Sequence, residues 1–263
     1  GSMGEQVLGL EVVLASGEVV RTKGVPKPAS GPSLNHLFIG SEGTLGVITE
    51  STLQVFPSPE KRVLRAVVFP DFEHGFSAVA DLYFQGVRPP VVDYGEELWP
   101  NGTVSSPKST LYLGFEGFAE DVDAHEARAM EVCGRLDGRD AGPEEAEEFW
   151  RTRHSAGDRY KREVLDSADP SDARERRRPY RMDYLHVALP VSQVLEYRLQ
   201  CSRLLSSHRA IVKEWSLWGR PEFFSFLIMR DQNPETDDPD GSLAEAVDAT
   251  LTLAQDMGGT MEY

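Results

Sequence analysis

A glycine-rich run near the start of the chain has the residue types and spacing expected around a flat ligand. In residues 40–50, GSEGTLGVITE, a glycine recurs at every third position from Gly40 to Gly46. Glycine has no side chain to pack and loses entropy when it is fixed, so this spacing indicates positive φ angles or a close approach of the backbone to another surface. The hydroxyls of Ser41 and Thr44 and the apolar residues that follow suit a flat ligand with polar edges. The structural alternative is a bulge and a tight turn between two buried strands.

The run does not match the standard phosphate-binding fingerprints. Its spacing is neither G-x-G-x-x-G nor G-x-x-x-x-G-K-S/T, so it predicts neither a Rossmann dinucleotide site nor a P-loop. The six histidines are scattered, and no two of them have metal-ligand spacing. The acidic segment 236–247 fails as a calcium loop, because Val247 stands where a bidentate Glu is required. No metal site is therefore predicted, and the spacing reveals no nucleophile-and-base set.

One basic cluster stands out in an otherwise acidic chain. Its five members are Arg174, Arg176, Arg177, Arg178 and Arg181. The planar guanidinium binds a carboxylate or a phosphate through two hydrogen bonds, which makes arginine the usual residue for an acidic substrate group. A solvated, charged loop is the alternative interpretation.

Aromatic residues gather in and between the strand-like segments 210–215 and 222–229. They are Trp215, Trp218, Phe224 and Phe226. A site lined by such residues favours a bulky or hydrophobic substrate. Alternate positions of a strand are equally where an aromatic sheet core would lie, so both interpretations stay open.

The composition limits the classes of protein that the chain could be. It has 263 residues, 40% of them hydrophobic, and a formal net charge of -16. Such a charge repels a phosphate backbone, so no nucleic-acid partner is expected. No run of about 18 apolar residues is present, so no membrane span is expected. The two cysteines stand alone and predict no disulfide framework, which favours a reducing compartment and hence a cytoplasmic protein.

Alternating and helical patterns predict the elements that would position these residues. A β-hairpin is expected within residues 8–20, and a strand over 47–56 that ends at Pro57. Beyond residue 60, strands are predicted at 62–69, 111–115, 184–189, 210–215 and 222–229. Helices are predicted at 72–84, 120–136, 144–160 and 191–206. A last helix starts at a capping box formed by Ser242 and Glu245 and ends before Gly258.

The order of these elements predicts the fold class. After residue 60 it reads β-α-β-α, an insert, and then β-α-β-β-α. Such alternation indicates an α+β fold in which helices cover a sheet, with two split βαβ units side by side.

The segment 31–60 resembles a known family. Its sequence, GPSLNHLFIGSEGTLGVITESTLQVFPSPE, is similar to that of the FAD-linked oxidases of the vanillyl-alcohol oxidase and para-cresol methylhydroxylase superfamily. The preceding GEQVLGLEVVLASGEVVRT resembles the same family's hairpin. Within the superfamily, the chain looks most like the glycolate oxidase D-subunit and proteins similar to alkyldihydroxyacetonephosphate synthase. The resemblance implies FAD as the cofactor, contacted by Glu42, Gly43, Thr44, Leu45, Gly46, Val47 and Ile48.

The resemblance also implies a domain organisation. Residues 1–58 would be the second part of an FAD-binding domain. Residues 59–263 would be a substrate or cap domain with an antiparallel sheet covered by helices, truncated at its end. In the family, a glycine-rich pyrophosphate loop precedes the hairpin, and a histidine-bearing motif follows the pair Gly258-Gly259. We therefore expect an interior fragment of a longer flavoprotein, with weak FAD binding and no activity by itself.

The resemblance also implies which residues of this chain would contact the substrate. Relatives place an anion-binding arginine before the strand 184–189, which makes Arg174 or Arg181 the expected residue. The stretch from Trp150 to His154 resembles an element at the start of the family's cap insert, so that Arg153 would face the site. Trp218 and Phe224 would line the same site.

This chain differs from two branches of the family at residues that take part in their reactions, and each difference argues against one type of reaction. The hydroxyacid-oxidising branch carries a metal-binding Gly-Asp-Gly-Asn-x-His motif, whereas this chain has Trp218-Gly219-Arg220-Pro221-Glu222 there. The alkyl-transferring branch has a catalytic Tyr where this chain has Phe223 or Phe224, and neither can donate a proton. No catalytic residue is therefore assigned from the sequence.

These features together predict an FAD-dependent oxidoreductase. It would oxidise a hydroxylated small molecule, acidic or bulky, by hydride transfer to the flavin. Two alternatives stay open: flavin-dependent alkyl transfer, and a non-catalytic α+β binding module. A homo-oligomer is compatible with each of them.

Overall fold

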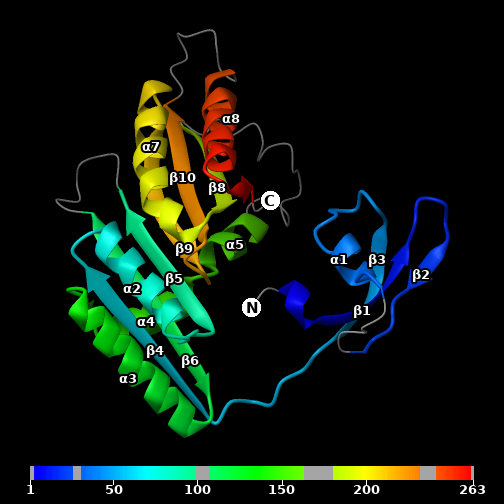
Figure 1. The fold of residues 1–263 in the computed structure, drawn as a ribbon, viewed down its shortest axis with the longest axis horizontal. Helices are drawn as coiled ribbons and strands as arrows, with labels where there is room; N and C mark the ends of the chain where they lie inside the picture. Colours follow the sequence, from blue (N-terminus) through cyan, green and yellow to red (C-terminus); the bar gives the residue numbers. More distant parts are fainter. Residues whose placement is uncertain (1–2, 26–30, 99–106, 163–179, 232–240, 262–263) are drawn as a thin grey trace. The chain divides into compact units, whose positions relative to one another are not determined.

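The computed structural model describes residues 3–25, 31–98, 107–162, 180–231 and 241–261. It divides into two compact units, an N-terminal unit of Gly1–Ser58 and a C-terminal unit of Pro59–Tyr263 (Figure 1).

The described residues of the N-terminal unit form a small antiparallel sheet in the order β2-β1-β3. After the 3-10 turn η1 (Met3–Gln6), the strands are β1 (Val7–Val13), β2 (Val19–Arg21) and β3 (Val47–Leu53). The predicted hairpin is therefore confirmed. Alternate residues of the central strand, Leu10 and Val12, pack with Phe38 as a small core.

A short helix, α1 (Leu34–Phe38), precedes the glycine run. Asn35 holds it on β1, because its side-chain amide donates to the carbonyl of Leu8 at 2.9 Å and its side-chain oxygen accepts from Thr22 Oγ1 at 2.6 Å. A five-residue helix has little stability of its own, so these contacts and the burial of Phe38 decide its position.

The described residues of the C-terminal unit form an eight-stranded sheet in the order β11-β8-β10-β9-β5-β6-β4-β7, with antiparallel pairing throughout. The strands are β4 (Lys61–Phe69), β5 (Val91–Glu97), β6 (Lys108–Gly117), β7 (Arg139–Asp140), β8 (Tyr180–Ala188), β9 (Ile211–Trp218), β10 (Phe223–Asp231) and β11 (Thr260–Met261). Besides α4 (Pro143–Thr152) and α5 (Ser155–Tyr160), the described helices between these strands are α2 (Phe72–Phe84), α3 (Ala119–Arg135), α7 (Val194–Ser207) and α8 (Gly241–Asp256). The 3-10 turn η3 (Val191–Gln193) precedes α7.

This sheet consists of two repeats of one motif. Both β4-α2-β5-β6-α3-β7 and β8-α7-β9-β10-α8-β11 follow the order β-α-β-β-α-β, and each places its strands in the spatial order 4-1-3-2. The repeats meet where β5 pairs with β9. The predicted α+β class and the two split βαβ units are confirmed.

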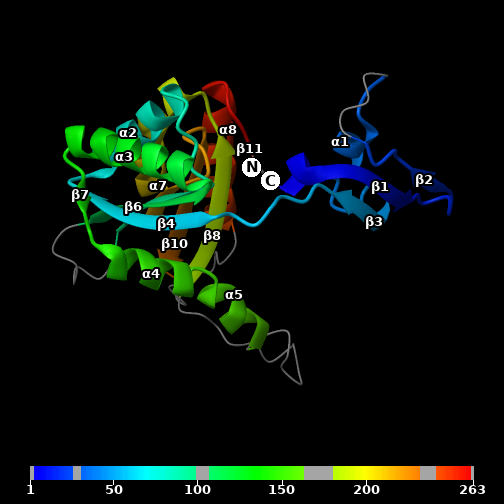
Figure 2. The same ribbon diagram turned by 90° about the horizontal axis from the view of Figure 1, so that it is seen from below.

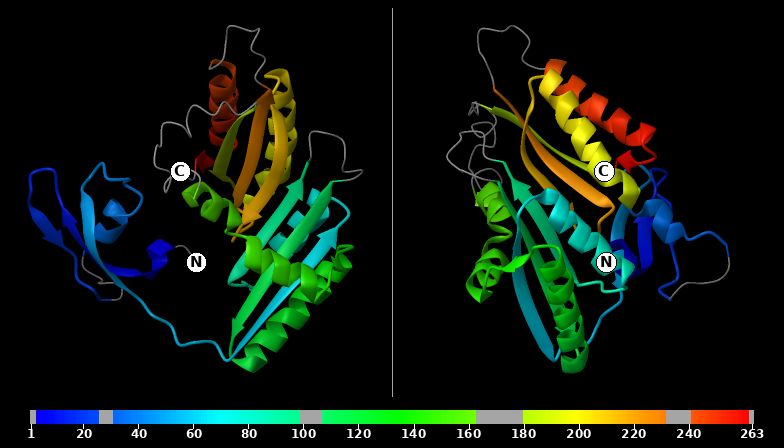
Figure 3. Two further views of the ribbon diagram at one scale, coloured as in Figure 1. Left: turned by 180° about the vertical axis from the view of Figure 1, so that it is seen from behind. Right: turned by 60° about the vertical axis from the view of Figure 1, so that its left-hand side comes forward.

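Four helices, α2, α3, α7 and α8, cover one face of this sheet (Figure 2). Strand alternation sends Leu111, Leu113 and Phe115 of β6 toward these helices, and all three are buried. The helices α7 and α8, yellow and orange to red in Figure 3, lie side by side, and Tyr197 Oη donates to the carbonyl of Thr250 at 3.0 Å. This face therefore holds the main hydrophobic core.

The opposite face is partly covered by α4 (Pro143–Thr152) and α5 (Ser155–Tyr160) (Figure 2). The single helix predicted over 144–160 is therefore wrong. Side chains satisfy the last carbonyls of α4, because Thr152 Oγ1 donates to Glu148 at 2.8 Å and the Arg153 guanidinium donates to Trp150. A second helix, α5, begins after His154.

Candidate functional site

The glycine run of the N-terminal unit forms a tight turn that leads into β3. Positive φ angles occur at Gly40 (82°), Glu42 (48°), Gly43 (80°) and Gly46 (156°). The backbone N–H of Thr44 donates to the carbonyl of Ser41 at 2.9 Å, and Thr44 Oγ1 donates to the same oxygen at 2.6 Å. The glycines therefore provide the left-handed conformations that the sequence predicted.

The turn lies at the surface rather than in a buried core. Leu45, Val47 and Ile48 are exposed, Val47 by 64% of its surface, and all seven residues of β3 are exposed. A Cβ on Gly43 would meet no atom within 4 Å. Apolar side chains and bare backbone are thus accessible along residues 42–48, which fits a flat ligand lying along this segment.

Gly46 has a different role from Gly43. A Cβ on Gly46 would lie 2.7 Å from Val12 Cγ1 and 2.9 Å from the carbonyl oxygen of Val13. The backbone of Gly46 therefore packs closely against β1. Gly46 fixes the start of β3, whereas Gly43 leaves the turn accessible.

In the C-terminal unit, a second set of residues lies on the sheet face opposite the core. Their strand neighbours Tyr94, Val187, Leu217 and Phe224 are buried under the helices, so alternation directs these residues to the other side. We call this set the polar face: Asp93, Tyr112, Tyr184, His186, Glu214, Ser216, Trp218 and Ser225.

Hydrogen bonds join the hydroxyl groups of the polar face. The Tyr184 hydroxyl lies 3.0 Å from Ser216 Oγ and 3.5 Å from Glu214 Oε1. His186 Nδ1 lies 2.8 Å from Ser225 Oγ. Ser216 and Ser225 are buried, so these hydrogen bonds fix the side chains of Tyr184 and His186.

Three rings of the polar face form a cluster. The ring centroids of Tyr184 and His186 are 4.7 Å apart, and those of Tyr184 and Trp218 are 5.5 Å apart. The His186 and Trp218 centroids are 5.3 Å apart. Since 43% of Trp218 is exposed, the cluster offers an aromatic surface to a ligand.

Two carboxyl groups of the polar face have raised pKa values. Burial, and then the charge of Glu214, raises the pKa of Asp93 to about 6. Burial and the nearby Glu97 raise the pKa of Glu214. Burial also raises the pKa of the Tyr184 phenol and lowers the pKa of His186. A carboxyl group with a pKa near neutrality can exchange protons under physiological conditions, which is the property of a general acid or base.

The residues predicted for the substrate site lie in different places. Trp218 belongs to the polar face. Arg153 is exposed at the end of α4, with its guanidinium 3.3 Å from the centroid of the Trp150 ring. Arg181 lies in β8 opposite Arg230. Arg174 lies outside the described residues.

Phe224 packs in the core and not on the polar face. It is fully buried, its ring centroid lies 5.5 Å from that of Trp215, and its ring packs edge-on against Phe72 at 5.9 Å. Its neighbour Ser225 is the residue of β10 that faces the other way. For Phe224, Trp215 and Phe226 the core interpretation therefore describes this structure, and we do not include Phe224 in the site.

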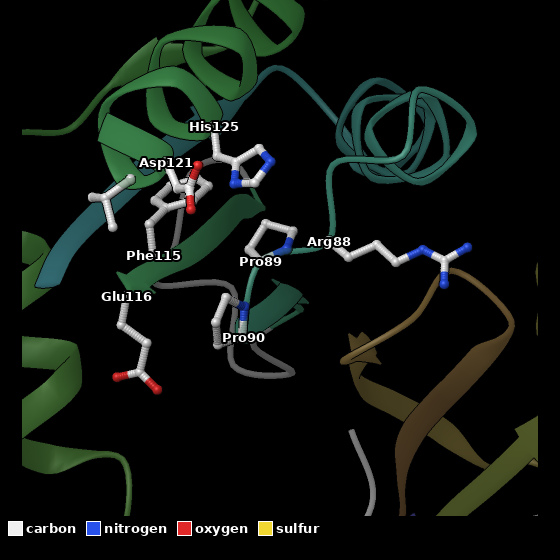
Figure 4. A pocket seen from close by; sticks show the side chains of 8 residues that line it. Arg88, Pro89, Pro90, Phe115, Glu116, Asp121 and His125 are labelled. Carbon is white, nitrogen blue, oxygen red and sulfur yellow. The ribbon is translucent and has the colours of Figure 1, made fainter. Parts of the chain in front are cut away.

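A small pocket lies elsewhere in the C-terminal unit, between β6, α3 and the loop before β5 (Figure 4). It is lined by Arg88, Pro89, Pro90, Phe115, Glu116, Asp121, Val122 and His125. Arg88 and Glu116 point away from Asp121 and His125, so the charged groups do not converge on one point. We assign no chemistry to it.

Sequence reasoning missed most of the polar face. Tyr184 and His186 do alternate within a predicted strand, which was a usable signal. Asp93 lies in β5, a strand that was not predicted. Among the described residues, no group of three His, Cys, Asp or Glu side chains could hold a metal ion, and no described helix is long and apolar enough to cross a membrane.

Comparisons with known proteins agree with this architecture. The chain is 32% identical over 170 residues to a probable mitochondrial D-lactate dehydrogenase of Danio rerio, covering 59% of the chain and 34% of that protein. It is 30% identical over 142 residues to glycolate oxidase subunit GlcD of Bacillus subtilis, covering 51% and 30%. The solved structure of an alkyldihydroxyacetonephosphate synthase matches with a TM-score of 0.69 at 16% identity, covering 99% of this chain and 50% of that one. The chain therefore spans about half the length of that solved protein.

The fold and these matches define the class as flavin-linked enzymes. Residues 58–262 match the family described as FAD linked oxidases, C-terminal domain, and the chain belongs to that family. The family predicted from the segment 31–60 is confirmed, and with it FAD as the cofactor of the family.

Proposed function

We propose that this chain is part of an FAD-dependent oxidoreductase that oxidises a hydroxylated substrate. Residues 1–58 would form the second part of the FAD-binding domain, and residues 59–263 the substrate domain. The observation that carries the proposal is the exposed turn at 42–48, which immediately precedes a unit that matches the FAD-linked oxidase family. The two buried free thiols, Cys133 and Cys201, support a cytoplasmic location.

The residues that would hold FAD are Glu42, Gly43, Thr44, Leu45, Gly46, Val47 and Ile48. Leu45, Val47 and Ile48 would supply apolar contact, and Gly43 would let the ligand approach the backbone. When bound, FAD supplies the two-electron oxidation, and the protein binds and orients the substrate and excludes water.

The polar face is the part of the C-terminal unit best suited to the substrate. Its aromatic cluster would hold an apolar portion, and its hydroxyls and carboxyls would bind a hydroxyl group. An arginine, Arg153, Arg174 or Arg181, would hold an acidic group if the substrate carries one.

Flavin titration tests the proposal. We expect the chain to quench the fluorescence of added FAD, and Val47→Asp to weaken FAD binding by about tenfold, because a charge would replace apolar contact. The matched control is Val55→Asp, which adds the same charge at an exposed position outside the turn. Equal binding by both variants, or no FAD binding by the native chain, would overturn the assignment.

The reaction type is tested separately. We expect substrate oxidation to bleach the flavin absorption bands of the full-length protein loaded with FAD. Catalysis without bleaching would instead favour alkyl transfer, the alternative left open by the sequence.

A further inference from the structure

We propose that Asp93 and Glu214 make the polar face selective for an uncharged, hydroxyl-bearing group, and that Asp93 accepts the hydrogen bond and the proton of that hydroxyl. The inference rests on the proposed function and narrows its substrate class. It selects a bulky neutral alcohol over a hydroxy acid at this site.

The two carboxyl groups lie on either side of a glycine in the sheet, Gly95. Gly95 of β5 is the register partner of Ser216 of β9, and Asp93 and Glu214 each precede that pair by two residues. A Cβ on Gly95 would find only Glu214 Oε1 at 3.7 Å and the carbonyl oxygen of Trp215 at 3.8 Å. The space above Gly95 is therefore the position that carries no side chain of its own, and a carboxylate oxygen lies at contact distance from it.

Hydrogen-bonding groups and an aromatic ring lie around the position above Gly95. Tyr184 Oη lies within 3.5 Å of Glu214 Oε1 and 3.0 Å of Ser216 Oγ. The Trp218 ring packs on Tyr184 with a centroid distance of 5.5 Å, and Trp218 is the register partner of Asp93. A hydroxyl above Gly95 would therefore lie near an acceptor, with an apolar ring beside it.

The charged groups around the space are mostly acidic. Glu214 and Glu97 come from β9 and β5, Tyr184 comes from β8, and Tyr112 of β6 donates to Glu145 of α4 at 3.0 Å. Within the described part of the chain, Lys213 acts on Glu214, and Lys108 pairs with Glu145 at 2.8 Å. An anionic substrate group would meet like charge here, and juxtaposed like charges are strongly unfavourable in a poorly hydrated site.

The proton step follows from these groups. The O–H bond of the substrate hydroxyl breaks, its proton moves to a carboxylate oxygen of Asp93, and the electron pair stays on the substrate oxygen. Burial, and then the charge of Glu214, raises the pKa of Asp93 and so increases its affinity for that proton. The step uses only groups of this chain and the substrate.

Ligand binding to the flavin-free chain tests the inference with benzyl alcohol and benzoate as probes, which differ in charge at similar size. The readout is tryptophan fluorescence, with Trp218→Phe used to assign the signal. At about two pH units above the pKa of Asp93, we expect the alcohol to bind at least about tenfold more tightly than benzoate. Asp93→Asn should remove most of this preference by raising the affinity for benzoate, whereas Glu120→Gln, an exposed residue of α3 on the helical side, should leave it unchanged.

A second variant tests the space itself. Gly95→Ala places a methyl group at ordinary contact distance, so the fold should be preserved while alcohol binding weakens at least about fivefold. Equal or tighter binding of benzoate, an unchanged preference in Asp93→Asn, or binding of neither probe would overturn the inference. None of these outcomes alters the FAD titration of the N-terminal unit, so the two proposals fail independently.

Discussion

Arg198 of α7 and Glu96 of β5 form an ion pair beneath the helices, and this pair joins the two repeats of the sheet. Only 5% of the Glu96 side chain is exposed, and its Oε1 accepts from the backbone N–H of Phe72 and from Ser109 Oγ, each at 3.1 Å. The Arg198 guanidinium lies 4.7 Å from the Phe72 ring centroid. One carboxylate thus links the start of α2, a strand of the first repeat and a helix of the second.

Removing Arg198 should destabilise the C-terminal unit strongly. In Arg198→Met, Glu96 would stay buried without its counter-charge, at a cost of about 3–5 kcal/mol. Urea unfolding followed by circular dichroism measures the loss. Arg203→Met, an exposed arginine on the same helix, is the matched control and should cost less than about 0.5 kcal/mol. Similar losses in both variants would show that the buried pair contributes little.

The two sides of the sheet should respond differently to changes in aromatic residues. Phe224→Ala should cost about 3–5 kcal/mol of unfolding free energy, because it leaves a cavity among Phe72, Trp215 and Phe226. Trp218→Phe should cost less than about 1 kcal/mol, since much of Trp218 is exposed. If Trp218→Phe proves the more damaging change, the assignment of the two faces is wrong.

Asp93 should make the stability of the C-terminal unit depend on pH. Its pKa rises from 3.8 to about 6 on folding, so its contribution to stability is complete below about pH 4 and is lost as the pH rises through about 6. The difference between these pKa values corresponds to about 3 kcal/mol, which partial exposure reduces to about 2. Asp93→Asn should therefore be more stable than the native chain above about pH 6 by about that amount.

Chemical denaturation at a series of pH values measures this difference. The contribution of His186 to stability depends on pH in the opposite direction. Burial lowers the pKa of His186, so this contribution is lost as the pH falls. Comparison of the native chain with Asp93→Asn isolates Asp93, since both contain His186. A stability difference that stays constant across the range would contradict the assignment of the raised pKa to Asp93.

The two glycines of the exposed turn should differ in their tolerance of a side chain. In Gly43→Ala the new methyl group would contact no other atom, so only the positive φ is unfavourable. This should lower the free energy of unfolding by about 1 kcal/mol. Gly46→Ala meets Val12 and the backbone of Val13 at less than 3 Å, so it should cost at least about 2 kcal/mol more. Thermal unfolding of the two variants measures the order, and a reversed order would contradict the packing of Gly46 on β1.

Much of the fold was predictable because its local signals agree. The helix at 72–84 was predicted to the residue, since its apolar spacing is regular and Asp71 caps it by accepting from the backbone N–H of His74 at 2.9 Å. The strand β5 was missed because Asp93, Gly95 and Glu96 have low strand propensity, and only pairing with β6 and β9 makes this segment a strand.

The polar face was less predictable than the fold. Trp215 and Trp218 lie three residues apart in β9, and an odd spacing in a strand places two side chains on opposite faces of the sheet. Trp215 is therefore in the core and Trp218 at the surface, although the residue type is the same. The proximity of Asp93 to Glu214 depends on the register between β5 and β9, which are more than a hundred residues apart in sequence. No local pattern encodes such a register.

The pairing of β5 with β9 has a consequence for how such a site could arise. Asp93 and Glu214 occupy matching places about the Gly95–Ser216 pair, one in each copy of the motif. Two identical half-length ancestors, associated edge to edge through this strand, would already have brought a pair of acids together about a two-fold axis. A fusion of the two copies into one polypeptide would then let each copy change separately, so that the two acids could take different roles.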